Sequence, residues 1–102
     1  MKRHARRAYT ALKAIGAPVL DPDLGWGGHF AISGEQYGHD DGFYEGHKDY
    51  ADDGMEWADY YSEDYQEVYS EFGVHKQIMR ILGDNDLYAE WNNPGVLAVF
   101  DI

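Results

Sequence analysis

Apolar residues near the start of the chain recur every three or four positions, which is the period of an amphipathic helix. We expect a helix over residues 3–15, followed by Gly16 in the left-handed conformation that ends many helices. The apolar stripe of this helix consists of Ala5, Ala8, Tyr9, Leu12 and Ile15. Residues 17–28 contain two prolines and three glycines and therefore predict a loop.

The pattern then changes to an alternation of apolar and polar residues around Phe30 and Ile32, which favours a strand over 29–37. A turn-forming sequence follows at 38–42. We expect 43–48 to return as the second strand of a hairpin.

The longest predicted helix covers residues 54–72. Asp53 would cap its start, and Glu56 would complete a variant of the capping box. Gly73 would end it. Its apolar stripe consists of Trp57, Tyr61, Tyr65, Val68 and Phe72.

The last third of the chain predicts a short helix over 74–82, stopped by Gly83, and then a second hairpin. Its strands cover 87–91 and 96–102. They are joined at 92–95 by an Asn-Asn-Pro-Gly turn, in which proline presets φ and glycine supplies a positive φ.

These elements predict an α+β fold in one domain, residues 1–102. A small antiparallel sheet of about four strands in two hairpins would pack with two to three helices, in the order α-β-β-α-α-β-β.

Charge adds information that the hydrophobic pattern lacks. The 102 residues contain 19 acidic and 8 basic side chains, a net charge of −11, and no cysteine. The missing cysteines exclude a disulfide scaffold, a thiolate zinc site and a cysteine nucleophile. Residues 1–20 carry five bases and no acid, whereas 35–71 carry thirteen acids and one base. A body this acidic is not expected to bind nucleic-acid phosphates directly.

Five acids on the predicted central helix follow one another at spacings of 3, 4, 4 and 4 residues, and we call them the acidic ridge: Glu56, Asp59, Glu63, Glu67 and Glu71. Such spacings line one helix face over roughly 22 Å, with Asp64 beside the row. Like charges four residues apart destabilise a helix by a few tenths of a kcal/mol each, and no base lies between 50 and 73 to offset them.

One interpretation is that the ridge imitates nucleic-acid phosphates and docks in the basic groove of a partner protein. A second acidic row would extend it: Asp40, Asp41, Glu45, Asp49, Asp52 and Asp53. Tyr60, at the edge of the apolar stripe, would be an amphipathic contact residue. The alternative interpretation is a solvated face of an acidic protein.

This charge architecture, acids from Glu56 to Glu71 above an aromatic stripe, resembles the small acidic DNA-mimic inhibitors of phages and mobile elements, such as anti-CRISPR and antirestriction proteins. The resemblance implies a partner with a nucleic-acid groove: a CRISPR effector, a restriction enzyme or a nuclease. It also implies the cytoplasm of a bacterial host, possible encoding by a phage, and no catalysis. These inhibitors share no common fold, so it implies nothing about architecture.

Two further functions stay open. Tyrosines within the acidic segment 59–64 are similar to the contact chemistry of colicin DNase immunity proteins, although those are helical bundles and the ends of this chain predict strands. The other is a metal- or ligand-binding domain. Its candidate ligands are His39, Asp41, Glu45 and His47, which do not have the spacing of a known metal motif.

No enzyme signature, cofactor motif, secretory signal or membrane-spanning run is apparent, so we expect a non-enzymatic cytoplasmic protein without a cofactor. The basic N-terminal helix could bind nucleic acid or an acidic partner. We favour the alternative that it neutralises the acidic body, within the chain or across a homodimer.

Overall fold

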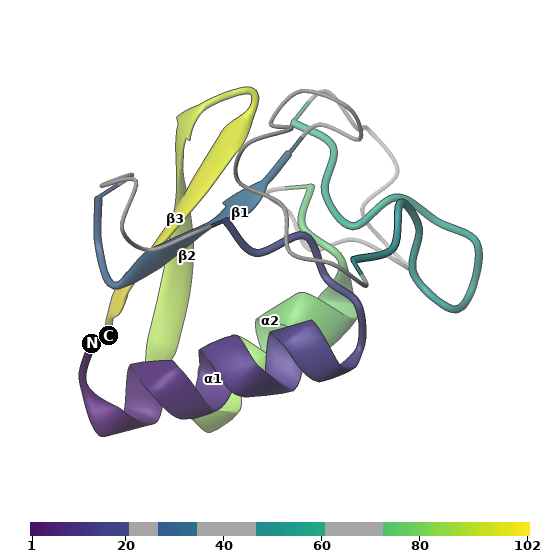
Figure 1. The fold of residues 1–102 in the computed structure, drawn as a ribbon. Helices are drawn as coiled ribbons and strands as arrows, with labels where there is room; N and C mark the ends of the chain where they lie inside the picture. The colour runs from purple at the N-terminus through teal and green to yellow at the C-terminus, as the bar shows by residue number, and fades with distance from the viewer. Residues whose placement is uncertain (21–26, 35–46, 61–72) are drawn as a thin grey trace.

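The computed structural model describes residues 1–20, 27–34, 47–60 and 73–102 (Figure 1). In these residues the chain forms α1 (Arg3–Ala14), β1 (Phe30–Ser33), α2 (Lys76–Asp84), β2 (Leu87–Asn93) and β3 (Val96–Asp101). The predicted α+β class is confirmed, with the order α-β-α-β-β in the described part of the chain. No helix in that part is long and apolar enough to cross a membrane.

The sheet is antiparallel, with β3 in the centre between β1 and β2. Phe30 of β1 lies opposite Val99 of β3, and Leu97 of β3 lies opposite Trp91 of β2. The β2–β3 hairpin turns at Pro94-Gly95, as the sequence predicts. The sheet therefore joins β3 to a strand that lies more than sixty residues earlier in the chain.

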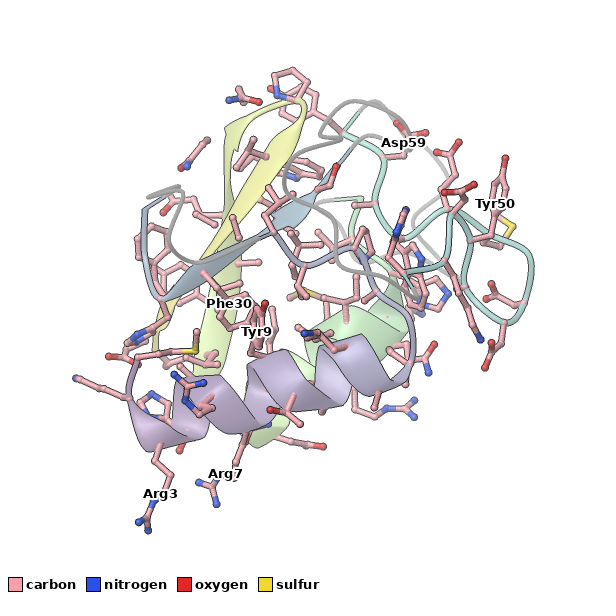
Figure 2. The ribbon with its side chains drawn as sticks, in the orientation of Figure 1. Arg3, Arg7, Tyr9, Phe30, Tyr50 and Asp59 are labelled. Carbon is pink, nitrogen blue, oxygen red and sulfur yellow. The ribbon has the colours of Figure 1, made fainter. Side chains whose placement is uncertain are left out.

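Both helices lie on the same side of the sheet, and the core fills the space between the two layers (Figure 1). The apolar stripe predicted for α1 is confirmed, because Ala5, Ala8 and Leu12 are fully buried. Tyr9 points from α1 toward the sheet and meets the Phe30 ring edge-on at 5.3 Å between centroids (Figure 2).

The first predicted hairpin is not formed in the described residues, because β1 pairs with β3 along one edge. Its other edge is bonded to the segment 18–20: the Leu20 N–H donates to the Ala31 carbonyl at 2.8 Å, and the Ser33 N–H donates to the Pro18 carbonyl at 2.9 Å. This part of the predicted loop is extended because Leu20 packs with Ala31 on the sheet face opposite the helices. Of the expected return strand 43–48, residues 47 and 48 lie in no strand, and the others, with 35–42, lie outside the described residues.

The start of the predicted central helix is also wrong, because residues 54–60 are not helical. Gly54 has φ +82°, which no helix accommodates. The backbone of 57–59 pairs instead with 73–75: the Asp59 N–H donates to the Gly73 carbonyl at 2.8 Å, and the His75 N–H to the Trp57 carbonyl at 2.9 Å. Residues 61–72 lie outside the described residues.

The second predicted helix is confirmed with shifted ends. The structure places α2 two residues later at each end than the predicted 74–82, so Gly83 lies inside it. His75 caps its start, since the Gln77 N–H donates to His75 Nδ1 at 3.0 Å. The first two predicted residues are absent from the helix because Val74 and His75 belong to the pairing with 57–59.

Candidate functional site

Residues 47–60 form a loop that stands out from the body of sheet and helices, and we call it the acidic lobe (Figure 1). It contains five acids and one lysine, giving a net charge of −4. The lobe is the described part of the acidic region 35–71 that the sequence predicts as a binding surface.

A tight turn forms the tip of the lobe. The Ala51 N–H donates to the Met55 carbonyl at 2.8 Å, and the Gly54 N–H donates back to the Ala51 carbonyl at 2.9 Å. Asp53 Oδ1 accepts from the Met55 N–H at 3.0 Å. The capping chemistry that the sequence assigns to Asp53 is thus used in an Asx turn, in which the carboxylate bonds to a backbone N–H two residues on.

Trp57 anchors the lobe to the core. Its side chain is 3% exposed, and its indole Nε1–H donates to the Lys48 carbonyl at 2.9 Å. The Lys48 N–H in turn donates to the Gly16 carbonyl at 2.7 Å, just after α1. The predicted core role of Trp57 is confirmed, although it arises from a loop and not from a helix.

His75 joins the lobe to α2. Its side chain is 8% exposed, and its Nε2 lies 2.9 Å from Asp53 Oδ2. The Met55 N–H and then the His75 ring, both hydrogen-bonded to the Asp53 carboxylate, lower the pKa of Asp53 from its ordinary value. One carboxylate therefore holds both the turn and His75, the residue that caps α2.

The surface of the lobe combines exposed carboxylates with exposed tyrosines. The side chains of Asp49, Asp52 and Asp53 are 45%, 76% and 45% exposed. Tyr50 and Tyr60 are 45% and 48% exposed. The ion pair between Asp52 and the only lysine of the lobe is long, 3.5 Å, and exposed. Such a pair does little to neutralise the surface.

The described part of the chain holds six of the thirteen residues that the sequence predicts as partner contacts. Asp52 and Asp53 are part of the turn, and Asp49 lies just before it in the sequence. Glu56 and Asp59 are half-buried and do not share a helix face, because no helix forms there. The Tyr60 ring, at the end of the lobe, meets the Trp91 ring of β2 edge-on, with 5.4 Å between the ring centroids. The other predicted contacts lie outside the described residues: Asp40, Asp41, Glu45, Glu63, Asp64, Glu67 and Glu71.

The arginines of α1 lie away from the acidic lobe, although the C-terminal end of the helix contacts the lobe through Gly16 and Lys48. Arg3 and Arg7 project from α1 away from the sheet, whereas Tyr50 and Asp59 lie at the opposite side of the view (Figure 2). Arg3, Arg6 and Arg7 line a shallow groove along α1 and make no ion pair with an acid in the described segments. The predicted neutralisation within the chain is therefore not seen for these three arginines among the described residues.

A second group of polar side chains gathers where the two ends of the chain meet (Figure 1). His4 Nε2 and His29 Nε2 lie 2.5 and 2.9 Å from the same oxygen of Asp101, Oδ1. Lys2 Nζ lies 3.3 Å from the other carboxylate oxygen, Oδ2. We call His4, His29 and Asp101 the terminal cluster. Hydrogen bonds from the two histidines, together with that of Lys2, hold the pKa of Asp101 well below its ordinary value.

The sequence does not predict the terminal cluster, because His4 and His29 lie 97 and 72 residues from Asp101 in the chain. The predicted metal ligands are in a different region. Of these, His47 is described, with Nε2 3.6 Å from Asp49 Oδ1; His39, Asp41 and Glu45 lie outside the described residues.

We compared the chain with models of protein families, with curated proteins and with solved structures, and none of the three comparisons gave a match. Its function is therefore argued from its own residues.

Proposed function

We propose that the protein is a non-enzymatic inhibitor whose acidic surface occupies the basic nucleic-acid groove of a bacterial defence protein. The observation that carries this proposal is the acidic lobe. Three exposed carboxylates and the exposed Tyr50 lie within residues 49–53 of a loop that Trp57 holds to the core. The partner would be a CRISPR effector, a restriction enzyme or a nuclease.

The lobe suits binding because it is charged and also anchored. A basic groove attracts a negative patch over a long range and so accelerates association. Backbone bonds from Lys48, Asp59 and His75 reduce the entropy that binding would otherwise have to remove. The amphipathic rings of Tyr50 and Tyr60 supply the contact area that carboxylates lack.

The acids outside the described residues belong to the same proposal. They bring the segment 35–71 to thirteen acids, against one lysine. We propose that their charge adds to the attraction of a basic groove for the surface of the lobe. Protein contacts would use this surface, while the arginines of α1 face away from it (Figure 2).

The experiment is capture of partners from a lysate of phage-infected bacteria, followed by elution with duplex DNA. We expect a captured protein that DNA releases, and release at moderate salt, because added salt screens charges on exposed surfaces. Elution of a CRISPR effector, a restriction enzyme or a nuclease identifies which class of groove is occupied.

A matched pair of variants separates a local surface from total charge. Asp49→Lys with Asp52→Lys reverses two charges on the lobe, whereas Asp84→Lys with Glu90→Lys reverses two exposed acids outside it. We expect the lobe variant to bind at least about tenfold more weakly, which corresponds to ~1.4 kcal/mol, and the other variant to bind nearly as the wild type does. Equal weakening by both variants, or capture that neither salt nor DNA reverses, would contradict the proposal.

A further inference from the structure

We propose that the terminal cluster is a binding site for a divalent transition-metal ion such as Zn²⁺, with His4 Nε2, His29 Nε2 and Asp101 Oδ1 as its protein ligands. The three ligand atoms all lie within 4.8 Å of one another. This site is separate from the acidic lobe, so either proposal can fail without the other.

The backbone positions each ligand independently. His4 lies in the first turn of α1. The His29 N–H donates to the Val99 carbonyl of β3 at 2.8 Å, which continues the β1–β3 pairing by one residue. Asp101 ends β3 and lies opposite Leu87 of β2. Ligands on three fixed elements form a site without a large rearrangement, as metal binding favours.

Gly28 makes the position of His29 possible. It has φ +63°, and a Cβ built on it would lie 2.2 Å from the Val99 carbonyl oxygen. Only glycine lets the chain approach β3 this closely immediately before the histidine.

The donor set indicates which ions fit. Two imidazoles and one carboxylate suit Zn²⁺ and similar first-row ions, whereas Ca²⁺ and Mg²⁺ prefer oxygen ligands. Metal–ligand bonds of about 2.0–2.1 Å place neighbouring donors roughly 2.9–3.4 Å apart. The His29–Asp101 separation of 2.9 Å is already in that range, and the His4–Asp101 separation of 2.5 Å must widen by about 0.5 Å.

Exposure and charge are also suitable. The histidine side chains are 27% and 17% exposed and the Asp101 side chain is 41% exposed, so an ion can enter and keep water on its remaining positions. The two rings meet edge-on, 5.6 Å apart and inclined at 80°, and are not stacked against each other. The net charge of −11 attracts cations to the molecule.

Lys2 is the neighbouring group that opposes a cation. It contacts Asp101 Oδ2 and leaves Oδ1 to the two histidines. Its side chain is 68% exposed, so solvent screens its charge and the side chain can turn away. Lys2→Met is therefore expected to bind the metal at least as tightly as the wild type.

The test is calorimetric titration of Zn²⁺ into protein without a histidine tag, in the presence of millimolar Mg²⁺ to occupy nonspecific acidic sites. We expect one Zn²⁺ per chain at this site. His4→Gln, His29→Gln and Asp101→Asn should each weaken it more than about tenfold. His47→Gln is the matched control, because His47 is a half-buried histidine beside an aspartate but outside the cluster.

A measurement on the wild type covers the case in which a variant does not fold. Zn²⁺ should slow the modification of His4 and His29 by diethyl pyrocarbonate and leave the modification rate of His47 unchanged. Mass spectrometry measures the rate at each histidine. Absence of binding at millimolar Zn²⁺ would overturn the proposal. It would also be overturned if Zn²⁺ protected His47 from modification and if His47→Gln was the variant that lost Zn²⁺ binding. The second result would place the metal in the region 39–47.

Discussion

Two glycines in the acidic lobe and its partner segment allow a sharp test of the local structure. Gly54 and Gly73 have φ of +82° and +77°, so alanine is strained at either position. They differ in their surroundings. A Cβ on Gly54 meets nothing within 4 Å, whereas a Cβ on Gly73 would lie 2.1 Å from the Asp59 carbonyl oxygen.

The magnitudes follow from these differences. A left-handed alanine costs roughly 1–2 kcal/mol, of which about 0.4–1 kcal/mol is recovered because alanine also restricts the unfolded chain. Gly54→Ala should therefore destabilise the protein by up to about 1.6 kcal/mol. Gly73→Ala must also push Asp59 away and lose the 2.8 Å bond between the Asp59 N–H and the Gly73 carbonyl, which adds about 1–3 kcal/mol.

Urea unfolding followed by tryptophan fluorescence and circular dichroism measures both values, with the m-value as a check on two-state behaviour. The sign for Gly54→Ala discriminates between the observed turn and the helix predicted from the sequence. At the first position of that helix alanine would carry no left-handed strain, and its restriction of the unfolded chain would leave the stability unchanged or raise it. A stabilised Gly54→Ala variant would refute the turn at the tip of the lobe, and equal effects at the two positions would refute the pairing of 57–59 with 73–75.

Other contacts give further predictions. Trp57→Phe removes the hydrogen bond to the Lys48 carbonyl and should destabilise the protein by about 1–3 kcal/mol in the same urea assay; an unchanged midpoint would contradict the anchoring role. Because the pKa of Asp53 is lower in the folded state, its carboxylate stabilises the fold above the unfolded-state pKa, near 3.8, and this contribution is lost as the pH falls through the folded-state value. Asp53→Asn should thus be less stable than wild type at pH 6 but approach it at pH 2, and urea midpoints that differ equally at both pH values would contradict this. Gly28→Ala should destabilise by about 2 kcal/mol or more in thermal unfolding, because the added carbon meets the carbonyl of β3; a change below 0.5 kcal/mol would contradict the close approach.

Local patterns predict the elements that local interactions determine. The stripe of α1 and the Pro-Gly turn of the last hairpin are visible in a few consecutive residues, and both are confirmed. Gly16 has the expected positive φ, +86°. The positive φ of Gly73, +77°, permits its close approach to Asp59, while residues 61–72, which would form the end of the predicted helix, lie outside the described residues.

Long-range pairing explains what the sequence does not predict. Asp53 and Glu56 form a valid capping pattern, yet tertiary bonds to 73–75 compete successfully for the backbone of 57–59. The terminal cluster depends on β1 lying beside β3, and no spacing rule relates residues 4, 29 and 101.

The proposed function requires the acidic lobe to compete with nucleic acid for one groove. Fluorescence anisotropy of a labelled DNA duplex bound to the purified partner measures this competition directly. We expect the wild type to displace the duplex at near one-to-one stoichiometry, and we expect added salt to weaken this displacement. Asp49→Lys with Asp52→Lys should remove most of the displacement. Simultaneous binding of protein and duplex to the partner, or full displacement by the lobe variant, would contradict the proposed function.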